Sequence, residues 1–281
     1  LQSSPGTKKT VGYASCFVTI TQLKLEAVMS LHRFYLPTLS NQSEEAQLSP
    51  EEAQHLTRVL RLKVGDNIRI FDGRGHEREA IIKHATNKKV IVSLGEPVCE
   101  AKGSKIVIDL GIALLTGRKF DAVIRDATML GAAVITPLLT LRSRCFKINQ
   151  DSDRLVERWK HIAVAATKQC GRSHLPVVNP PTQFGQYIEA RSMAVERKLL
   201  LLEPNKDASQ NNAIPLQQLT SPSRPRTASI AIGPEGGWTT DEIRLAENSD
   251  YVPITLGLNT LRAESVPTVA LSVLRFMWSD F

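Results

Sequence analysis

Near the C-terminus of the 281-residue chain, a short apolar run leads into the glycine-rich stretch GPEGGW, residues 233–238. Glycines between a strand and a helix either make a tight turn or let the backbone approach a ligand closely. The stretch lacks the Gly-Lys-Ser/Thr ending of a phosphate-binding loop and the G-x-G-x-x-G pattern of a dinucleotide fold. Taken alone, it favours a structural turn over a ligand-binding loop.

Two other strand ends carry charged side chains. Glu203 follows the apolar run KLLLL, and Arg262 and Glu264 follow the run that ends at Gly257. Arg262 and Glu264 either form a local salt bridge or face a ligand, and their spacing favours neither. Because ligands of open α/β sheets bind beyond the carboxyl ends of the strands, the three loops together predict a small-molecule site. They contain no elbow serine and no Cys/His pair, so group transfer from an activated donor suits them best.

The elements that must position these loops alternate along the chain from about residue 105. Five continuous apolar runs are predicted strands: KIVIDLGIALL, AAVITPLL, KLLLLEP, SIAIGPEG and YVPITLG. Apolar residues at helical spacing predict helices over residues 120–130 and 155–170, and Thr239 with Glu242 forms a capping box for another. A final helix begins near residue 265, and its predicted buried face consists of Val266, Val269, Ala270, Val273, Leu274 and Met277. This alternation predicts a parallel sheet covered on both faces.

The sequence pattern of residues 32–100 predicts a small, mostly β domain with one helix, a compact barrel or sheet. Ser49 is the expected N-cap of the helix, Pro50 its first residue and Glu52 the partner that completes a capping box. The predicted apolar face of the helix consists of Leu56, Val59 and Leu60. Three short strands follow, separated by turns rich in Gly, Asp and Asn. The polar stretch at residues 96–104 is the predicted boundary before a second domain over residues 104–281.

Composition limits the class of protein. The formal net charge of +7 is concentrated in residues 101–172, which contain 13 basic and 6 acidic side chains. Such a regional excess indicates either a polyanion-binding face or an ordinary solvated surface. The four cysteines are far apart and no His/Cys cluster has zinc spacing, so we expect no structural metal and a reducing compartment. No apolar run approaches the length of a membrane span.

Residues 1–31 show no clear helical or strand period and contain one acidic residue among several Ser and Thr. This composition predicts that the segment is a leader or is disordered. A transit peptide, one kind of leader, would normally contain arginine, and this segment has none. Met29 is an alternative start of the chain. We expect a cytoplasmic protein, or an organellar one if the segment is a transit peptide.

The three loops LLLLEP, IAIGPEGGWTTDEI and ITLGLNTLRAES, in this order, resemble the cofactor loops of the RsmE family. This family comprises the 16S ribosomal RNA (uracil-N3) methyltransferases of the SPOUT superfamily. HRFYL, FDGRG, GRKFDAVIRDATMLGA and KQCGRS resemble further family blocks in the same order. The resemblance implies a PUA-like RNA-binding β-barrel followed by a SPOUT-type α/β domain with a C-terminal trefoil knot. It also implies S-adenosylmethionine as methyl donor, a homodimer, and a uridine of 16S rRNA or of the small ribosomal subunit as acceptor.

Carried onto this chain, the resemblance assigns three groups of residues. The donor would contact Leu202, Glu203, Ile232, Gly233, Pro234, Glu235, Gly236, Gly237, Leu256, Gly257, Leu261 and Arg262. For catalysis, Arg262 would stabilise charge on the uracil oxygens, and Glu264 would act as a base or, more in keeping with a carboxylate beside arginine, orient Arg262. The basic groups that would contact RNA are Arg33, Arg58, Arg61, Arg118, Lys119, Arg142, Arg144 and Arg172.

Among the departures of the chain from the family pattern, three change a charge. Asn259 replaces an arginine, and Met129 and Lys168 each replace a glutamate. Two other readings stay open: a catalytically inactive RNA-binding paralogue, and a SPOUT methyltransferase that acts on another RNA. Donor binding separates the first from an enzyme, and the position of the modified nucleotide identifies the second.

Overall fold

The computed structural model describes residues 31–40, 42–98, 104–143, 152–191, 195–204, 213–219 and 224–280. The predicted leader therefore lies outside the described residues except for Leu31. So do Arg144 and most of the predicted boundary between the two domains, which stays a prediction. Within the described ranges, no helix has the length and apolar character that a membrane span requires.

The larger sheet is parallel throughout, as the sequence predicts. Its strands run in the order β11-β13-β10-β12-β6-β7-β8, and β9 also pairs with β7. The strands are β6 (Val107–Ala113), β7 (Val134–Leu139), β8 (Val177–Val178), β9 (Thr182–Gln183), β10 (Arg197–Leu201), β11 (Ile214–Pro215), β12 (Thr227–Ile232) and β13 (Val252–Thr255). The order places β13, β10 and β12 side by side, so the three predicted ligand loops leave the same edge of the sheet.

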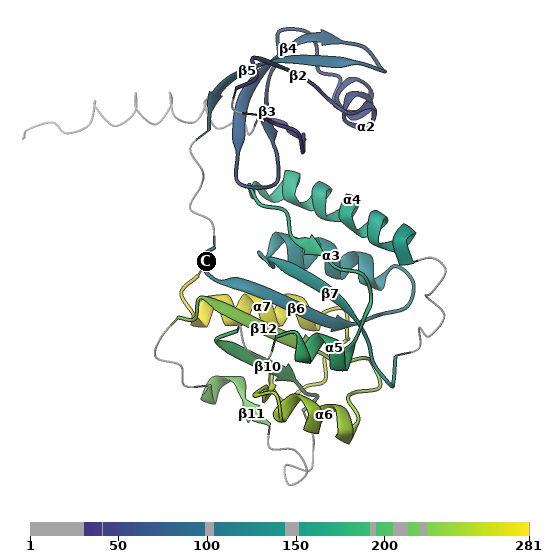
Figure 1. Cartoon of the computed structure of the whole chain (residues 1–281), viewed down its shortest axis with the longest axis vertical. Helices are drawn as coiled ribbons and strands as arrows, with labels where there is room; N and C mark the ends of the chain where they lie inside the picture. Colours follow the sequence, from purple (N-terminus) through teal and green to yellow (C-terminus); the bar gives the residue numbers. More distant parts are fainter. Residues whose placement is uncertain are drawn as a thin grey trace, which may run out of the picture. The chain divides into compact units, whose positions relative to one another are not determined.

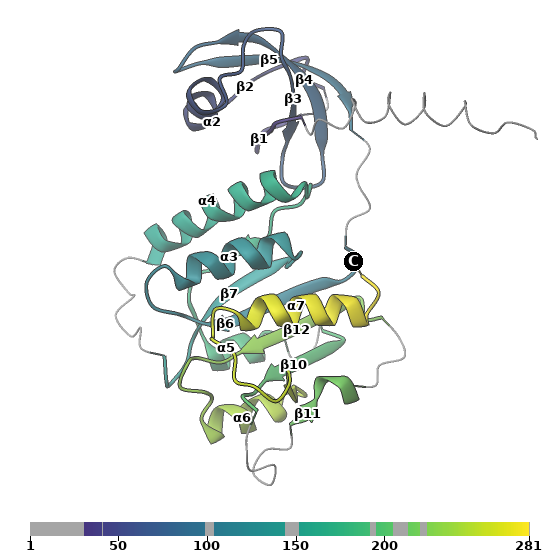
Figure 2. The ribbon, with the colours of Figure 1, turned by 180° about the vertical axis from the view of Figure 1, so that it is seen from behind.

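Helices cover both faces of this sheet (Figures 1 and 2). On one face lie α3 (Lys119–Met129) and α7 (Val266–Met277), with α4 (Ser152–Cys170) packed on α3. On the other lie α5 (Phe184–Glu189) and α6 (Thr240–Glu247), while η4 (Leu216–Gln218) is a short 3-10 helix. Alternate strand residues divide between the two layers: Leu199 and Ile230 pack toward α3 and α7, and Leu200 and Ala231 toward α5 and α6.

The smaller sheet has the strand order β1-β3-β4-β5-β2. Its strands are β1 (Arg33–Tyr35), β2 (Glu45–Gln47), β3 (Asn67–Phe71), β4 (Glu77–Ala85) and β5 (Val90–Pro97). Among the described residues, β1 and β2 remain the two edges, so the predicted barrel is a curled half-barrel. Phe34, Ile70 and Ile82 form its core together with Leu56 from the adjacent helix. The trefoil knot implied by the family resemblance stays a prediction.

The helix beside the small sheet differs from the prediction in two details. It consists of α2 (Pro50–Gln54) followed by the π-helical turn η2 (His55–Val59). A π-helical turn holds more residues than an α-helical one, so Val59, the last residue of this turn, leaves the face predicted from the α-helical period and is 66% exposed. Ser49 caps the helix as expected, but the Glu52 carboxylate bonds to Lys168 of α4 at 2.7 Å and 2.9 Å instead of completing a capping box.

Helix α7 also differs from the prediction, because it carries apolar side chains on two sides. Its inner side packs into the core through Pro267, Ala270, Leu271 and Leu274. Three apolar residues form the outer apolar face of α7: Val273, Phe276 and Met277, which are 37%, 77% and 39% exposed. The prediction that Val273 and Met277 are buried is therefore wrong. Helical periodicity alone does not distinguish an apolar face that packs in the core from one that is exposed on the surface.

Candidate active site

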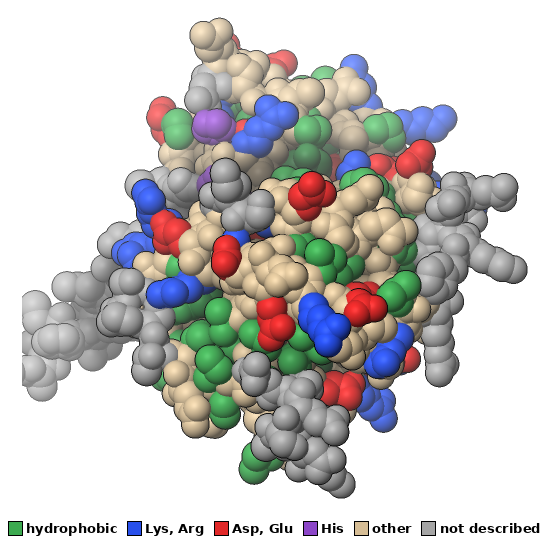
Figure 3. All heavy atoms as spheres, turned by 60° about the horizontal axis from the view of Figure 1, so that its bottom comes forward, with side chains coloured by type: hydrophobic (Ala, Val, Ile, Leu, Met, Phe, Trp, Pro, Cys, Tyr) green, Lys and Arg blue, Asp and Glu red, His purple; other side chains and the backbone are tan. Residues whose placement is uncertain are grey.

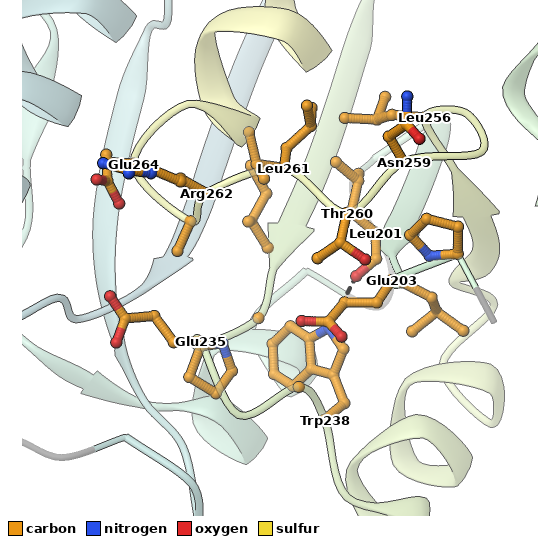
Figure 4. A pocket seen from close by; sticks show the side chains of 18 of the residues that line it. Leu201, Glu203, Glu235, Trp238, Leu256, Asn259, Thr260, Leu261, Arg262 and Glu264 are labelled. Carbon is orange, nitrogen blue, oxygen red and sulfur yellow. Dashed lines mark hydrogen bonds between the residues drawn. The ribbon is translucent and has the colours of Figure 1, made fainter. Parts of the chain in front are cut away.

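Three loops at the carboxyl ends of β10, β12 and β13 enclose a pocket of about 360 Å³ (Figure 4). The loop after β10 begins at Leu202, the loop after β12 contains the GPEGG turn, and the loop after β13 spans residues 256–265. The pocket lies where parallel α/β sheets bind ligands. Every residue predicted to contact the methyl donor lines it except Gly236 and Gly257.

The GPEGG turn is shaped by Trp238, which the sequence reasoning did not assign to the site. A Cβ atom on Gly233 would lie 2.8 Å from the Nε1 atom of Trp238, so only glycine leaves room for the indole ring. Gly237 has a φ of 68°, a backbone conformation that favours glycine. The predicted function of the glycines is therefore refined: at these two positions they allow the packing and direction of the turn itself.

The turn is also held from the neighbouring loop after β7. Arg142 Nη1 donates to the carbonyl oxygens of Gly236 at 2.9 Å and Trp238 at 3.2 Å. Thr239 and Glu242 form the predicted capping box at the start of α6, and the buried Glu242 carboxylate also accepts a 2.9 Å hydrogen bond from the backbone of Leu141. Arg142 and Glu242 thus join the turn and the start of α6 to the loop after β7.

A lysine joins two of the three pocket loops. Lys119, the first residue of α3, hydrogen-bonds to the Glu235 carboxylate, and its Nζ atom lies 3.6 Å from Oε2 of Glu264. The hydrogen bond to Glu235 raises the pKa of Lys119, and the charge of Glu264 adds to that shift. Lys119 also lines the pocket, and its predicted contact with RNA stays a prediction. The sequence pattern that indicates this location is the position of Lys119 at the start of a predicted helix, just after the end of a predicted strand.

The two predicted catalytic residues both line the pocket, but they do not pair with each other. Figure 4 shows Arg262 and Glu264 on the same side of the pocket, with Glu235 facing them from the turn. The Oε2 atom of Glu264 lies 3.6 Å from the ammonium group of Lys119, and its expected function of orienting Arg262 stays a prediction. Arg262 is exposed and forms no hydrogen bond or ion pair with the residues that the structure describes. Arg262 thus lines the pocket without a protein partner in that part of the chain.

Two of the predicted RNA-contacting arginines have structural functions. The Arg33 side chain is 8% exposed, pairs with Glu77 at 2.7 Å, and donates to the carbonyl oxygens of Thr167 and Arg172. Arg172 in turn donates to the carbonyl oxygens of Thr128 and Ala132, and burial lowers its pKa. These bonds join β1 to α4 and α4 to the end of α3. Spacing alone could not distinguish such buried arginines from surface ones.

The remaining predicted RNA contacts are exposed or lie outside the described residues. Arg58, Arg61 and Arg118 are exposed, and Arg142 is exposed while supporting the turn. Arg144 lies outside the described part of the chain. Figure 3 shows that acidic and basic side chains are interspersed on the face it presents. No group of three or more potential metal ligands occurs within the described ranges.

Comparison with known families gives the class of the protein. The family model described as an RNA methyltransferase domain matches residues 102–275, and the model of an RNA methyltransferase PUA domain matches residues 48–95. The fold, the strand-end pocket and these matches define an RNA methyltransferase that carries a PUA domain.

Individual relatives narrow the class to one family. Ribosomal RNA small subunit methyltransferase E of Synechocystis sp. is 36% identical over 80% of this chain and 71% of its own length. A Legionella pneumophila protein described as a methyltransferase, solved with S-adenosylmethionine, is 30% identical, with a TM-score of 0.79 over 88% of this chain and 98% of its own. Ribosomal RNA small subunit methyltransferase E from Neisseria gonorrhoeae, solved with the same cofactor, is 25% identical, with a TM-score of 0.78 over 88% and 98%. The chain belongs to the ribosomal RNA small subunit methyltransferase E family.

Proposed function

We propose that this chain transfers a methyl group from S-adenosylmethionine to N3 of a specific uridine in small-subunit ribosomal RNA. The observation that carries the proposal is the pocket of about 360 Å³ at the ends of β10, β12 and β13, built from the loops that resemble the family's cofactor loops. The names of the relatives support the reaction, and the two solved relatives with S-adenosylmethionine support the donor.

The residues present fit this donor. Leu201, Leu202 and Leu256 provide apolar walls for an adenosine, and carboxylates at the opening suit a ligand that carries a sulfonium and an ammonium group. The Oε2 atom of Glu264 is buried and has no hydrogen-bond partner among the described residues, so it can accept a bond from a ligand. We assign donor binding to the lining residues of the three loops, and the donor when bound supplies a methyl group that needs no further activation.

The chemistry of the acceptor, uridine N3, determines which catalytic groups the protein must supply in addition to the donor. Uridine N3 carries a proton and becomes nucleophilic as that proton is lost, which places negative charge on the flanking carbonyl oxygens. Arg262 lines the pocket without a partner among the described residues, and we assign it to stabilising this charge. Glu264 and Glu235 hold Lys119 between the last and middle loops, so we assign Glu264 a positioning function.

Exposed arginines suit the RNA partner. We infer that Arg58 and Arg61 on the small domain and Arg118 beside the pocket contact phosphates, which carry most of the affinity of proteins for RNA. The substrate is either free 16S rRNA or the assembled small subunit. We infer action in the cytoplasm, or in an organelle if residues 1–31 are a transit peptide.

We further infer a homodimer formed through the outer apolar face of α7. Phe276 at 77% exposure lies beside Met277 and Val273, and large apolar side chains that cluster on one helix face usually mark an interface. Met129, at 38% exposure near the end of α3, extends the apolar surface on a helix that contacts α7. Figure 2 shows α7 on the near side of the sheet, with no described helix in front of it.

The test combines donor binding with primer extension. Calorimetry should show S-adenosylmethionine binding to the pure protein, and reverse transcription of treated small-subunit rRNA should stop at one position because N3-methyluridine blocks base pairing. Donor binding without any stop would favour a methyltransferase that acts on another RNA, whereas the RNA-binding paralogue should not bind the donor. No donor binding would reject the enzyme. A stop on a different RNA would identify a SPOUT methyltransferase with another target.

A further inference from the structure

The last turn of α4 forms an ion pair with the small domain, the part of the chain that contains the smaller sheet and α2. The ammonium group of Lys168 lies 2.9 Å and 2.7 Å from the two carboxylate oxygens of Glu52 on α2. The two side chains are only 16% and 12% exposed, so solvent screens this pair less than it screens a surface pair. Removal of one partner from such a pair leaves a mostly buried charge without compensation. The contact between α4 and α2 therefore has a strongly preferred geometry.

Two further side chains of the small domain surround the same ammonium group. The Nδ1 atom of His55, the first residue of η2, lies 3.4 Å from it. The centre of the Phe34 ring lies 5.2 Å from it, within the range of a cation–π interaction. Phe34 is fully buried in the core of the smaller sheet, so its ring moves only together with that core. Lys168 thus has one defined position on the small domain.

Neighbouring contacts hold the two domains together independently of this ion pair. The carbonyl oxygen of Thr167, the residue before Lys168, accepts a 2.9 Å hydrogen bond from Arg33 of β1. Beyond the end of α4, the backbone amide of Leu175 donates a 2.9 Å hydrogen bond to the carbonyl oxygen of Gly73. Loss of the ion pair should therefore change how α2 lies on α4 without separating the domains.

The helix that contains Glu52 leads directly to two of the proposed RNA contacts. Helix α2 continues without a break into η2, which contains Arg58, and Arg61 follows shortly after η2 ends. Both arginines are exposed. Phosphate contacts fix the register of a protein on a nucleic acid, although they read no sequence. Because Lys168 holds the first turn of this segment on α4, a displacement of that turn would carry both arginines with it.

We propose that Lys168 and Glu52 are positioning residues that determine which nucleotide of a bound RNA reaches the donor pocket. The inference rests on the proposed function and adds to it a determinant of the target position. The ion pair fixes Arg58 and Arg61 relative to α4, and α4 packs on α3, whose first residue, Lys119, lines the pocket. A displacement of about 1 Å can cost about 100-fold in the rate of a transfer reaction. The pair thus acts through the register of the RNA and has no contact with the reacting atoms.

Charge reversal tests the pair. Lys168→Glu places two carboxylates together and should lower the single-turnover methylation rate at saturating small-subunit rRNA by about 10-fold or more. Glu52→Lys should have a similar effect, and the double variant, which restores an ion pair, should recover the wild-type rate within about threefold. Dissociation constants for S-adenosylmethionine and for the rRNA should change by less than about threefold, because the donor pocket and the phosphate contacts remain.

The matched control is Glu51→Lys. It makes the same charge change one position earlier on α2, where the side chain is exposed, and should keep the wild-type rate. Glu52→Gln keeps the shape of the side chain and applies the same test if charge reversal prevents folding. All rates are compared at a temperature at which circular dichroism shows folded protein, so that a purely structural pair would leave the saturated rate unchanged. A wild-type rate in the single variants, or a double variant no faster than they are, would overturn the proposal.

Hydroxyl-radical footprinting on small-subunit rRNA gives a second readout that needs no methyl transfer. Arg58→Ala first identifies the nucleotides that this part of the small domain protects. The wild type, Glu51→Lys and the double variant should protect the same nucleotides, whereas Lys168→Glu should shift that protection to others. An unchanged footprint in Lys168→Glu would overturn the proposal even if the enzyme methylates as proposed. A shifted footprint from a protein that transfers no methyl group would reject the proposed function and leave the positioning of the RNA standing.

Discussion

The indole of Trp238 ties the middle loop of the donor pocket to the strand beside it, because its Nε1 atom donates a 2.9 Å hydrogen bond to the carbonyl oxygen of Leu201. Both residues are buried, and the indole ring also packs against Phe184 with ring centroids 4.4 Å apart. The bond links the loop after β12 to the end of β10, which are separate in the sequence. The shape of the donor pocket thus depends on the side chain of Trp238 as well as on the backbone of the three loops.

Replacing Trp238 by Phe should weaken donor binding and lower stability together. The substitution keeps an aromatic ring but leaves the buried Leu201 carbonyl without its partner, a loss of about 1 to 2 kcal/mol in the free energy of unfolding. Donor affinity measured by calorimetry should fall by roughly tenfold. Trp278→Phe is the control: Trp278 is equally buried but lies at the end of α7, so it should lose stability and keep donor affinity. Equal donor affinities for both variants would contradict the assignment of Trp238.

Arg262→Ala should impair methylation more than donor binding. Loss of one group that stabilises charge in a transition state typically costs about 100-fold in rate or more. Single-turnover methylation should show that loss, while the dissociation constant for S-adenosylmethionine changes by less than about threefold. Arg262→Lys should restore part of the rate because it keeps a positive charge. Equal losses in rate and donor affinity would make Arg262 a donor-binding residue instead.

The sequence predicted the sheet, the three loops and most of the donor pocket, because each depends on local pattern. Apolar runs of strand length fixed β6, β7, β10, β12 and β13, and the capping box of Thr239 and Glu242 fixed the start of α6. Since the carboxyl ends of parallel strands lie at one end of the sheet, the pattern alone predicts that loops far apart in sequence lie together.

What could not be predicted depends on contacts between distant residues. No local rule pairs Lys119 with Glu235 and Glu264, and none distinguishes the buried Arg33 from the exposed Arg58. Lys168, where the family usually has a glutamate, is explained in the structure: its ammonium group bonds to the carboxylate of Glu52, which lies 116 positions away in the sequence. Val59 is exposed at the end of a π-helical turn, and no local sequence pattern marks such a turn.

Lys119→Met should reduce methylation by roughly tenfold through loss of loop positioning. Without the ammonium group, the carboxylates of Glu235 and Glu264 lose the cation that holds them on one side of the pocket. Lys119→Arg keeps the charge and should recover most of the rate, and Arg125→Met tests for a general effect of charge loss on the same helix. Steady-state kinetics should show the change mainly in kcat. A phenotype of Arg125→Met as large as that of Lys119→Met would point to nonspecific loss of RNA binding.

Asp109 should give the chain a stability contribution that grows on acidification. Burial raises the pKa of the Asp109 carboxyl above its usual 3.8, although hydrogen bonding to Arg191 opposes the shift. The folded state then binds the proton more tightly than the unfolded state, so protonation stabilises folding. Relative to Asp109→Asn, the wild type should gain free energy of unfolding as the pH falls through the folded pKa, with the gain complete below 3.8. Urea unfolding of both proteins between about pH 7 and pH 3 measures the difference.

Asp72 provides a comparison of opposite sign. Burial alone would raise its pKa, but hydrogen bonds from the backbone of Arg74 and from the ring and backbone of His76 lower it below 3.8. The wild type should therefore lose stability relative to Asp72→Asn as the pH falls below that value. If both pairs of proteins changed in the same direction, the burial of Asp109 would not control its titration.

Phe276→Glu should convert the protein from a dimer to a monomer. The side chain is 77% exposed at the centre of the outer apolar face of α7, so a carboxylate there costs nothing in the isolated fold but must be desolvated in an interface. Sedimentation velocity should show a monomer with unchanged circular dichroism. Leu245→Glu, at 42% exposure on α6 across the sheet, adds the same charge away from this face and should leave the dimer intact. A Phe276→Glu protein that sediments as the wild type does would exclude this face as the dimer interface.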